Sequence, residues 1–441
     1  MKKLFLTLVI AFAGILSANA QVWVGGSLNA NFKKDVNKIA VVPEIGYSFQ
    51  DSHWTIAAAA KYNYSDGANK LILSPYVRYS VCNIEKFALF MSIKTYFDAK
   101  AAEEKPVSSI WNVYWPKELA RCNEEALKEW KKEHEKEIEI FKVIQFFFDV
   151  QWMELKKYAN DNGIKLIGDI PIFVATDSAD VWSNQDMFQL DEDGRLSCVA
   201  GVPPDYFCAD GQLWGNPIYD WDAMKKDGYS WWISRIKRVF ELTDILRIDH
   251  FRGFEAYWSV PFGEKTAING KWIKGPGVDL FKTIKKKLGD LPVIAEDLGV
   301  ITDEVRQLRD DCNFPGMKVL QFAFSPDEIR QNGMVNYFMP HNFETSNCVV
   351  YTGTHDNDTM QGWLENASDE QVLIVGQYIY GKKLTVEKVR AAIKSGDLRK
   401  NMIKAVIASS ANYAVVPMQD VAGVGNEGRM NMPSTTGANW T

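Results

Sequence analysis

Three short apolar runs that each end in carboxylates constrain the fold of this chain more than any other feature. The first runs from Ile245 to Asp249, the second from Leu291 to Asp297 and the third from Cys348 to Asp358, and helix-compatible sequence follows each of them. Apolar strands that alternate with helices predict a parallel sheet with helices packed against it. Because parallel strands end on one rim, we expect the acidic residues of the three runs to gather there, where the active sites of parallel barrels lie.

Arg247 and Asp249 lie two residues apart at the end of the first run. On a strand this spacing points both side chains to the same side. A carboxylate beside a guanidinium stays ionised and has its oxygens held in place, as a nucleophile requires. A structural ion pair at a strand end would give the same pattern, and the two residues alone do not separate these interpretations. Carboxylates from three strands together suggest glycoside chemistry.

Further strand-like runs extend the pattern. We expect strands at residues 163–173, 243–249, 291–296, 317–324, 348–355 and 413–418. The predicted fold class is therefore α/β, an incomplete TIM (β/α)8-type barrel with about six of the eight strands. Residues 175–222 form a long insertion whose aromatic residues include Trp182, Trp214, Tyr219 and Trp221. Such rings either stack on sugar faces or build the core of a subdomain.

The N-terminal part of the chain has a different character. Residues 1–20 carry two lysines, an apolar run and Ala18-Asn-Ala20, which fits a signal peptide cleaved before Gln21, with a membrane anchor as the alternative. Residues 21–98 alternate with period two, for example from Leu71 to Val81 and from Phe87 to Ile93. The alternation predicts a small antiparallel β-sheet fragment that resembles part of an outer-membrane β-barrel and would associate with a membrane. A soluble antiparallel sheet is the alternative.

A charged linker at residues 99–105 is expected to join this fragment to the remaining segment, residues 106–441. Two helices are expected next, at Cys122–Phe148 and Gln151–Asn162. The charges of the first helix indicate a solvated face rather than a binding surface.

The composition excludes several classes of function. The net charge of -6 offers no basic surface to nucleic acid. The six cysteines lack the spacing of a zinc site or of a disulfide framework. A metal site at His355, Asp356 and Asp358 is a weak alternative, because a second histidine at helical spacing is absent. Asp191-Glu-Asp-Gly194 predicts a tight turn rather than a calcium loop. We expect neither a cofactor nor a metal.

Eight ordered blocks resemble the 4-alpha-glucanotransferases, the amylomaltase or disproportionating-enzyme family of the alpha-amylase clan. The three carboxylate blocks read Leu-Arg-Ile-Asp-His-Phe-Arg-Gly, Ile-Ala-Glu-Asp-Leu-Gly and Thr-Gly-Thr-His-Asp-Asn-Asp-Thr. Supporting blocks begin at Gly168, Gly201, Gly211, Pro340 and Arg429. The resemblance runs from about Pro106 to Thr441. It implies that the Gly-Asp-Ile-Pro strand is the third of the family barrel, so that the first two strands are missing and the family continues beyond the C-terminus.

The resemblance also implies roles for individual residues. Asp249 would be the nucleophile that forms a β-glucosyl-enzyme intermediate, and Glu296 the acid that protonates the leaving oxygen. Asp356 would bind sugar hydroxyls and stabilise the oxocarbenium-like state. Asp169 would pair with Arg247 and be structural. Glu296 must then have a raised pKa to stay protonated near neutral pH, and the pKa of Asp249 must not be raised. The substrate-binding residues implied by the resemblance are Arg247, His250, His355, Gln212, Trp214, Tyr206, Phe207 and Asn431.

The expected function is transfer of α-1,4-glucan segments between maltooligosaccharides by a retaining double displacement. The nearest alternative is an alpha-glucan hydrolase of the same clan. Another alternative is an outer-membrane barrel fragment joined to an inactive enzyme, because missing strands would expose unpaired edges and weaken or abolish activity. The expected localisation is conflicting. The leader indicates export to the periplasm or outer membrane, whereas the resembled family works in the cytoplasm.

Overall fold

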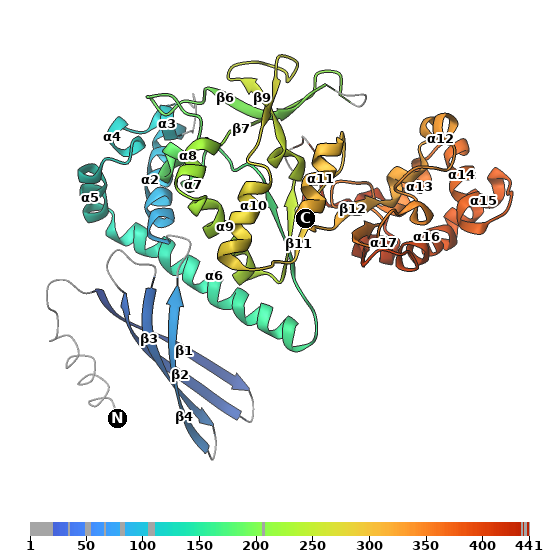
Figure 1. The fold of residues 1–441 in the computed structure, drawn as a ribbon. Helices are drawn as coiled ribbons and strands as arrows, with labels where there is room; N and C mark the ends of the chain where they lie inside the picture. Colours follow the sequence, from blue (N-terminus) through green and yellow to red (C-terminus); the bar gives the residue numbers. More distant parts are fainter. Residues whose placement is uncertain are drawn as a thin grey trace. The chain divides into compact units, whose positions relative to one another are not determined.

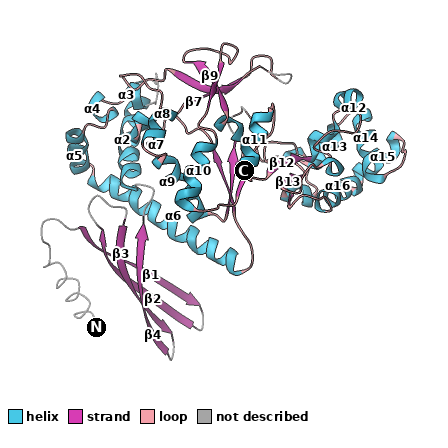
Figure 2. Cartoon of the chain, in the orientation of Figure 1, coloured by secondary structure: helices cyan, strands magenta, loops and turns pink. Residues whose placement is uncertain are grey.

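The structure is a computed structural model that describes residues 21–33, 36–48, 54–65, 68–79, 84–104, 111–204, 208–433, 435 and 439–440. The predicted leader at residues 1–20 lies outside these residues and stays a prediction, as does the localisation that depends on it. The chain divides into two compact units. One comprises Met1–Glu154, Asp177–Asn184 and Ser230–Arg238, and the other Leu155–Thr176, Gln185–Tyr229 and Val239–Thr441. Figures 1 and 2 show the elements of both.

The first unit begins with a four-stranded antiparallel sheet in the order β1-β2-β3-β4 (Figure 2). Its strands are β1 (Gln21–Lys33), β2 (Val36–Ser48), β3 (Trp54–Ser65) and β4 (Ala68–Tyr79). Each strand pairs with the next along the chain, as in the pairing of Val24 with Ile45. The antiparallel pairing predicted from the alternation is therefore confirmed over these strands.

The strand expected from Phe87 to Ile93 and most of the expected linker instead form one helix, α2 (Ile84–Glu104). Ala88, Leu89 and Phe90 are all buried, although they are consecutive. A strand would place neighbours on opposite faces, whereas a helix can bury such a group together with residues one turn later, such as Ile93. The period-two interpretation was wrong here because it counted only every second position.

The first unit continues with α3 (Trp111–Tyr114), α4 (Lys117–Ala120), α5 (Glu124–Glu133), α6 (Glu135–Asp161) as far as Glu154, and α7 (Ala179–Ser183). The boundary between the two expected helices was misplaced. Asn123 caps α5 by accepting from the amides of Glu125 and Ala126, and His134 ends it with φ -115°. The helix α6 then runs without a break through the expected gap near residue 150, because no glycine or proline interrupts it.

The second unit contains six parallel strands in two sheets, ordered β11-β8-β5 and β12-β13-β14. The strands are β5 (Ile167–Pro171), β8 (Ile245–Asp249), β11 (Val293–Ala295), β12 (Gly316–Val319), β13 (Cys348–Tyr351) and β14 (Tyr413–Val415). All six predicted strand positions are confirmed, although β12 ends early and continues as the 3-10 helix η3 (Leu320–Phe324). Among the described residues, no strand pairing closes these sheets into a barrel.

Asp297 connects the two parallel sheets. Its buried carboxylate accepts from the backbone amide of Met317 at 2.7 Å and from Arg309 at 2.7 Å. A backbone hydrogen bond from Ala295 to Pro315 joins the same strands. A Cβ atom on Gly316 would lie 2.4 Å from the Asp297 carboxylate, so glycine is required where the sheets meet. Asp297 therefore has a structural role beside Glu296.

The insertion builds a four-stranded antiparallel sheet, β10-β9-β6-β7, that the sequence did not predict. It consists of β6 (Cys198–Val202), β7 (Gln212–Pro217), β9 (Ala256–Pro261) and β10 (Lys271–Lys274). The predicted tight turn is confirmed, because the Asp191 side chain accepts from the amides of Asp193 and Arg195. Two of the four strands come from beyond β8, so the sheet depends on contacts distant in sequence.

Most insertion aromatics belong to cores. Trp182, Tyr219 and Trp221 are buried, and the Tyr219 hydroxyl donates to the Ile172 carbonyl at 2.7 Å. Trp214 is different, since 37% of it is exposed. The sequence left open whether these rings stack on sugars or build a core. Three of them are core residues, whereas Trp214 is exposed enough to contact a ligand.

The remaining helices follow α7 along the chain. They are α8 (Trp221–Lys226), α9 (Ser230–Leu242), α10 (Val278–Leu288), α11 (Asp303–Asp311), α12 (Pro326–Asn332), α13 (Met360–Asn366), α14 (Asp369–Tyr380), α15 (Val386–Lys394), α16 (Asp397–Ile407) and α17 (Met418–Ala422). Most of α9 belongs to the first unit. Short 3-10 helices are η1 (Gln185–Met187), η2 (Phe251–Phe254), η4 (Pro340–Asn342) and η5 (Asn426–Gly428). A core that includes Leu364, Val375, Val389 and Met402 holds α13 to α16 together. In the described part of the chain, every helix is too short or too polar to cross a membrane.

Candidate active site

Arg247 on β8 lies between two carboxylates. Its Nη1 atom is 2.6 Å from Asp169 Oδ2, and its Nη2 atom is 2.9 Å from Asp249 Oδ1. The parallel pairing of β5 with β8 places Asp169 opposite Arg247. The pairing of Asp169 with Arg247 and the shared side of Arg247 and Asp249 are both confirmed. The guanidinium therefore fixes the orientation of the Asp249 carboxylate from one side.

The pKa of Asp249 is raised above its ordinary value, which the sequence interpretation did not expect. Burial is the largest cause, the positive charge of Arg247 opposes it, and the negative charge of Asp169 adds to it. The side chain keeps 44% of its surface accessible, but the surrounding protein atoms remove enough water from the carboxylate to outweigh Arg247. Asp249 thus ionises less readily than Arg247 alone would allow.

Glu296 follows β11 and lies against the residues that follow β8. Its Oε2 atom accepts from the His250 amide at 2.7 Å, and Oε1 accepts from the Leu298 amide at 2.9 Å. Its own amide donates to the Ile248 carbonyl at 3.0 Å. Burial and the charge of Asp249 raise the pKa of Glu296 to about 7, against the lowering effects of Arg247 and the two amides. The expected raised pKa is confirmed, so part of the Glu296 population is protonated at neutral pH.

Asp356 lies in the segment that follows β13. Asn431 Nδ2 donates to Asp356 Oδ1 at 2.6 Å, and His355 Nε2 lies 3.3 Å from Asp356 Oδ2. Burial acts to raise the pKa of Asp356, but the hydrogen bonds from His355 and Asn431 hold it below its ordinary value. The charge of Asp356 acts on Asp249, and Arg247 acts on Asp356. The carboxylates from three strand ends therefore belong to one electrostatic cluster, as predicted.

His250 is half-buried directly after the Asp249 strand, in a left-handed backbone conformation with φ 51°. Burial and the nearby Arg252 lower its pKa to about 3, so the imidazole is neutral. Its ring packs edge-on against Trp214 at 4.7 Å, and Trp214 donates to Gln212 Oε1 at 3.1 Å. Its Nε2 atom has no hydrogen-bond partner among the described residues. The structure thus brings three predicted binding residues together, whereas Tyr206 and Phe207 lie outside the described residues.

Trp440 lies beside the candidate site, and the sequence interpretation did not include it. Its ring lies 5.1 Å from the ring of His355, and 64% of the residue is exposed. The Asn431 amide donates to the His355 carbonyl at 3.1 Å, and the Trp440 amide donates to the Met430 carbonyl at 2.7 Å. The Arg429-Met-Asn431 block was recognised, but the aromatic residue shortly after it was not connected to the site.

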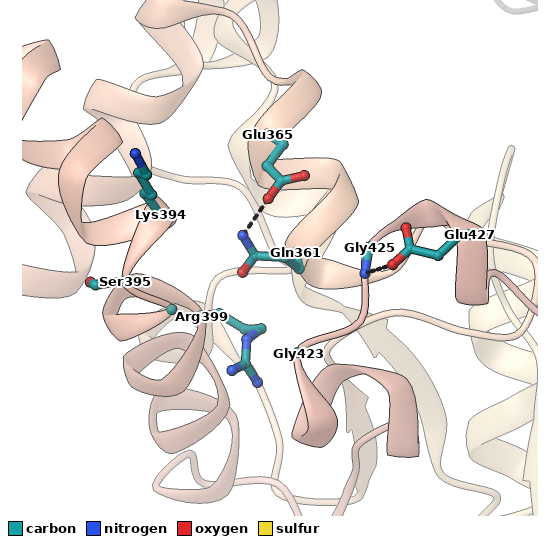
Figure 3. A pocket seen from close by; sticks show the side chains of 9 residues that line it. Gln361, Glu365, Lys394, Ser395, Arg399, Gly423, Gly425 and Glu427 are labelled. Atoms are coloured by element: carbon teal, nitrogen blue, oxygen red, sulfur yellow. Dashed lines mark hydrogen bonds between the residues drawn. The ribbon is translucent and has the colours of Figure 1, made fainter.

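A cavity of about 400 Å³ lies elsewhere in the second unit (Figure 3). Its lining residues are Gln361, Glu365, Lys394, Ser395, Gly396, Arg399, Gly423, Gly425 and Glu427. None of them is a predicted site residue. Gln361 donates to Glu365 and the Gly425 amide donates to Glu427, so two of its acidic groups are already bonded within the wall (Figure 3). The cluster of perturbed carboxylates, and not this cavity, identifies the candidate active site.

Within the described residues, no group of three or more His, Cys, Asp or Glu side chains is arranged to hold a metal ion. The chemistry that the site offers comes from its carboxyl groups. Glu296 can donate a proton near neutral pH, and Asp249 beside it can act as a nucleophile when ionised. This is the pair of roles that retaining glycoside chemistry requires.

Comparisons with known proteins found one matching family. A family model described as 4-alpha-glucanotransferase matches residues 47–441. A 4-alpha-glucanotransferase of Streptococcus pneumoniae serotype 4 is 45% identical over 361 residues, which cover 81% of this chain and 66% of that protein. One from Synechocystis is 46% identical over 356 residues, which cover 80% of this chain and 65% of that protein. The chain therefore spans just under two thirds of the length of these relatives.

A solved structure is also similar. Amylomaltase from Streptococcus agalactiae in complex with acarbose has a TM-score of 0.73 and 40% sequence identity, and the match covers 81% of this chain and 67% of that chain. The family match begins at residue 47, inside the segment that was expected to be an outer-membrane fragment. None of these comparisons supports that expectation. The resemblance therefore extends further toward the N-terminus than Pro106.

Proposed function

The chain belongs to the 4-alpha-glucanotransferase family, and on this basis we propose that it transfers α-1,4-glucan segments between maltooligosaccharides. The observation that carries the proposal is that the charge of Asp249 acts on Glu296 and, together with burial, raises its pKa to about 7. This value suits a group that must act first as an acid and then as a base. We further propose that the six parallel strands are an arc of the family barrel. Their order and the likeness to the Streptococcus agalactiae amylomaltase support this arrangement.

The proposed reaction has two displacements. In the first, Asp249 attacks the anomeric carbon, the glycosidic bond breaks, and Glu296 protonates the departing oxygen. In the second, the Glu296 carboxylate takes the proton of an acceptor 4-hydroxyl, whose oxygen attacks the same carbon and releases Asp249. Two inversions retain the α configuration, and the two carboxyl groups must lie about 5–5.5 Å apart. Arg247 orients Asp249 throughout.

The remaining site residues would bind the sugar. The Asp356 carboxylate would accept hydrogen bonds from ring hydroxyls. The neutral His250 ring would help to position Trp214, against which it packs. Trp214 and Trp440 offer exposed ring faces on which a glucose unit can stack. The proposed set of sugar-binding residues also includes Gln212, His355, Asn431, Tyr206 and Phe207. The acarbose bound to the Streptococcus agalactiae relative supports a glucan-like ligand here.

The experiment that tests the proposal is product analysis after incubation of the purified chain with maltotriose. Glucose together with a ladder of longer maltooligosaccharides is expected. Glucose and maltose without longer products would support the alternative, an alpha-glucan hydrolase, because water would then be the acceptor. Absence of any product under conditions where a full-length relative is active would contradict the proposal and favour an inactive chain.

The pH dependence of kcat/KM for maltotriose is expected to be bell-shaped. Glu296 must be protonated in the first displacement, so activity should fall as the pH rises through about 7. Asp249 must be ionised, so activity should also fall as the pH is lowered and Asp249 becomes protonated. Because the pKa of Asp249 is raised, this acid limb should lie at a higher pH than an ordinary aspartate would give. Initial rates at constant ionic strength between about pH 4 and pH 9 measure both limbs. A flat profile above neutral pH would contradict the role of Glu296.

A further inference from the structure

The segment that carries Asp356 has no regular secondary structure of its own. Residues 352–359 lie between β13 and α13, outside any helix or strand. Within the segment, Thr354 bonds Asn357 Oδ1 through its amide and its hydroxyl, both at 2.8 Å. A loop of this kind keeps a fixed shape only if other parts of the chain hold it. We call residues 352–359 the Asp356 loop.

The two ends of the Asp356 loop are fixed by one buried carboxylate. Asp420 on α17 accepts from the Thr352 hydroxyl at 2.5 Å and from the Met360 amide at 2.7 Å. Asp420 is only 1% exposed, so both bonds are protected from water. This contact explains how the base of the loop is held, but it does not reach Asp356.

The tip of the Asp356 loop is held by Arg429. Its Nη2 atom donates to the Asp356 carbonyl at 2.6 Å, and its Nη1 atom donates to Asp358 Oδ1 at 2.5 Å. Its Nε atom donates to the Asn431 carbonyl at 2.9 Å. Asn431 in turn donates to the Asp356 carboxylate. The Arg429 guanidinium therefore joins the backbone of Asp356, the side chain of Asp358 and the backbone of Asn431, whose side chain bonds Asp356.

We infer that Arg429 is a positioning residue for Asp356, which acts by fixing the Asp356 loop and its Asn431 partner rather than by touching the glucan. The inference rests on the proposed transfer activity, because Asp356 is proposed to bind the sugar. The guanidinium suits this role because its planar fork donates in three fixed directions at once. A lysine has one nitrogen and cannot replace all three contacts.

The first test replaces Arg429 by Met and by Lys. For Arg429→Met, kcat for maltotriose transfer is expected to fall by about 10- to 100-fold with KM changed by less than about twofold, because displacement of an oriented group mainly affects the transition state. Arg429→Lys should give a smaller loss. Hydrogen exchange of the peptide that covers residues 352–360 should become faster in both variants. Unchanged kcat or unchanged exchange in Arg429→Met would overturn the inference.

The matched control is Arg390→Met. Arg390 on α15 makes the same kind of contacts, donating to the Ala367 carbonyl at 2.6 Å and to Asp369 Oδ1 at 2.9 Å, on a loop that carries none of the site residues. Both variants should lose thermal stability to a similar extent. If Arg390→Met lowers kcat as much as Arg429→Met does, the effect is general destabilisation and the positioning role is refuted.

A double-mutant cycle with Asp356→Ala separates this inference from the proposed function. If Arg429 acts through Asp356, Arg429→Met should cost less than about twofold in the Asp356→Ala background. Additive losses would overturn the inference while leaving the proposed function intact. A wild-type chain that forms no transfer products would instead refute the proposed function, and the positioning role would fall with it.

Discussion

Replacing Asp249 by Asn is expected to lower kcat for maltotriose transfer by about 10⁴-fold or more, because the covalent intermediate cannot form without the carboxylate nucleophile. The substitution keeps the shape of the side chain. It leaves Arg247 paired with Asp169 at 2.6 Å, so the guanidinium keeps a charged partner. The expected loss is therefore chemical and not a consequence of unfolding, and the thermal midpoint should stay close to that of the wild-type chain.

Trapping of the intermediate measures this prediction directly. With α-maltosyl fluoride as donor and Glu296→Gln as the background, in which the second displacement is slow, the intact mass of the chain should increase by one maltosyl unit, and fragmentation should place the adduct on Asp249. Asp249→Asn should give no adduct. Asp169→Asn is the matched control, since it removes the other partner of the same arginine, and it should still form the adduct. An adduct on another residue, or an equal amount of adduct after Asp249→Asn in the same background, would contradict the assignment.

Replacing Glu296 by Gln is expected to slow maltotriose transfer by about 10²- to 10⁴-fold, the usual contribution of a general acid and base. The first displacement with α-maltosyl fluoride should be nearly unaffected, because fluoride leaves without protonation. The second displacement should be slow, because no base activates the acceptor hydroxyl. The glycosylated enzyme should therefore accumulate in this variant.

Azide distinguishes loss of the acid and base from a general loss of structure. As an anion it needs no base, so it should restore turnover of the fluoride donor in Glu296→Gln and give a glycosyl azide product. Asp297→Asn is the matched control, since it changes the adjacent carboxylate, which the structure uses to join β11 to β12. That variant should lose stability and should show no rescue by azide. Failure of azide to rescue Glu296→Gln would remove Glu296 from the proposed mechanism.

The alkaline limb of the pH profile should also disappear in Glu296→Gln. In the wild-type chain this limb reports the ionisation of Glu296, whose pKa is about 7 because burial and the charge of Asp249 disfavour its ionised form. Glutamine does not titrate, so the residual rate with the fluoride donor should be constant above neutral pH. The limb at low pH, which depends on Asp249, should remain.

Several parts of the fold could be read from the sequence because they depend on neighbouring residues. The six parallel strands are short apolar runs bounded by polar residues, and each is found where it was predicted. The shared side of Arg247 and Asp249 follows from their two-residue spacing on a strand, whereas the pairing of Arg247 with Asp169 was implied by the resemblance. The two failures share one cause, because both elements depend on contacts with residues distant in the sequence. From Phe87 to Ile93, burial against the core shows that the segment is a helix. The insertion sheet needs strands from two distant segments.

The amino-acid sequence by itself determined which residues can carry the chemistry, since the carboxylates Asp249, Glu296 and Asp356 stand at strand ends in recognisable blocks. Only the tertiary structure decided how these groups behave. Burial raises the pKa of Asp249 despite the charge of Arg247. Burial and the charge of Asp249 raise the pKa of Glu296 against the opposing effect of two backbone amides. Contacts from residues 429–431 hold Asp356. The burial of a carboxylate and its long-range hydrogen bonds depend on tertiary contacts between distant segments, and the local sequence does not specify those contacts.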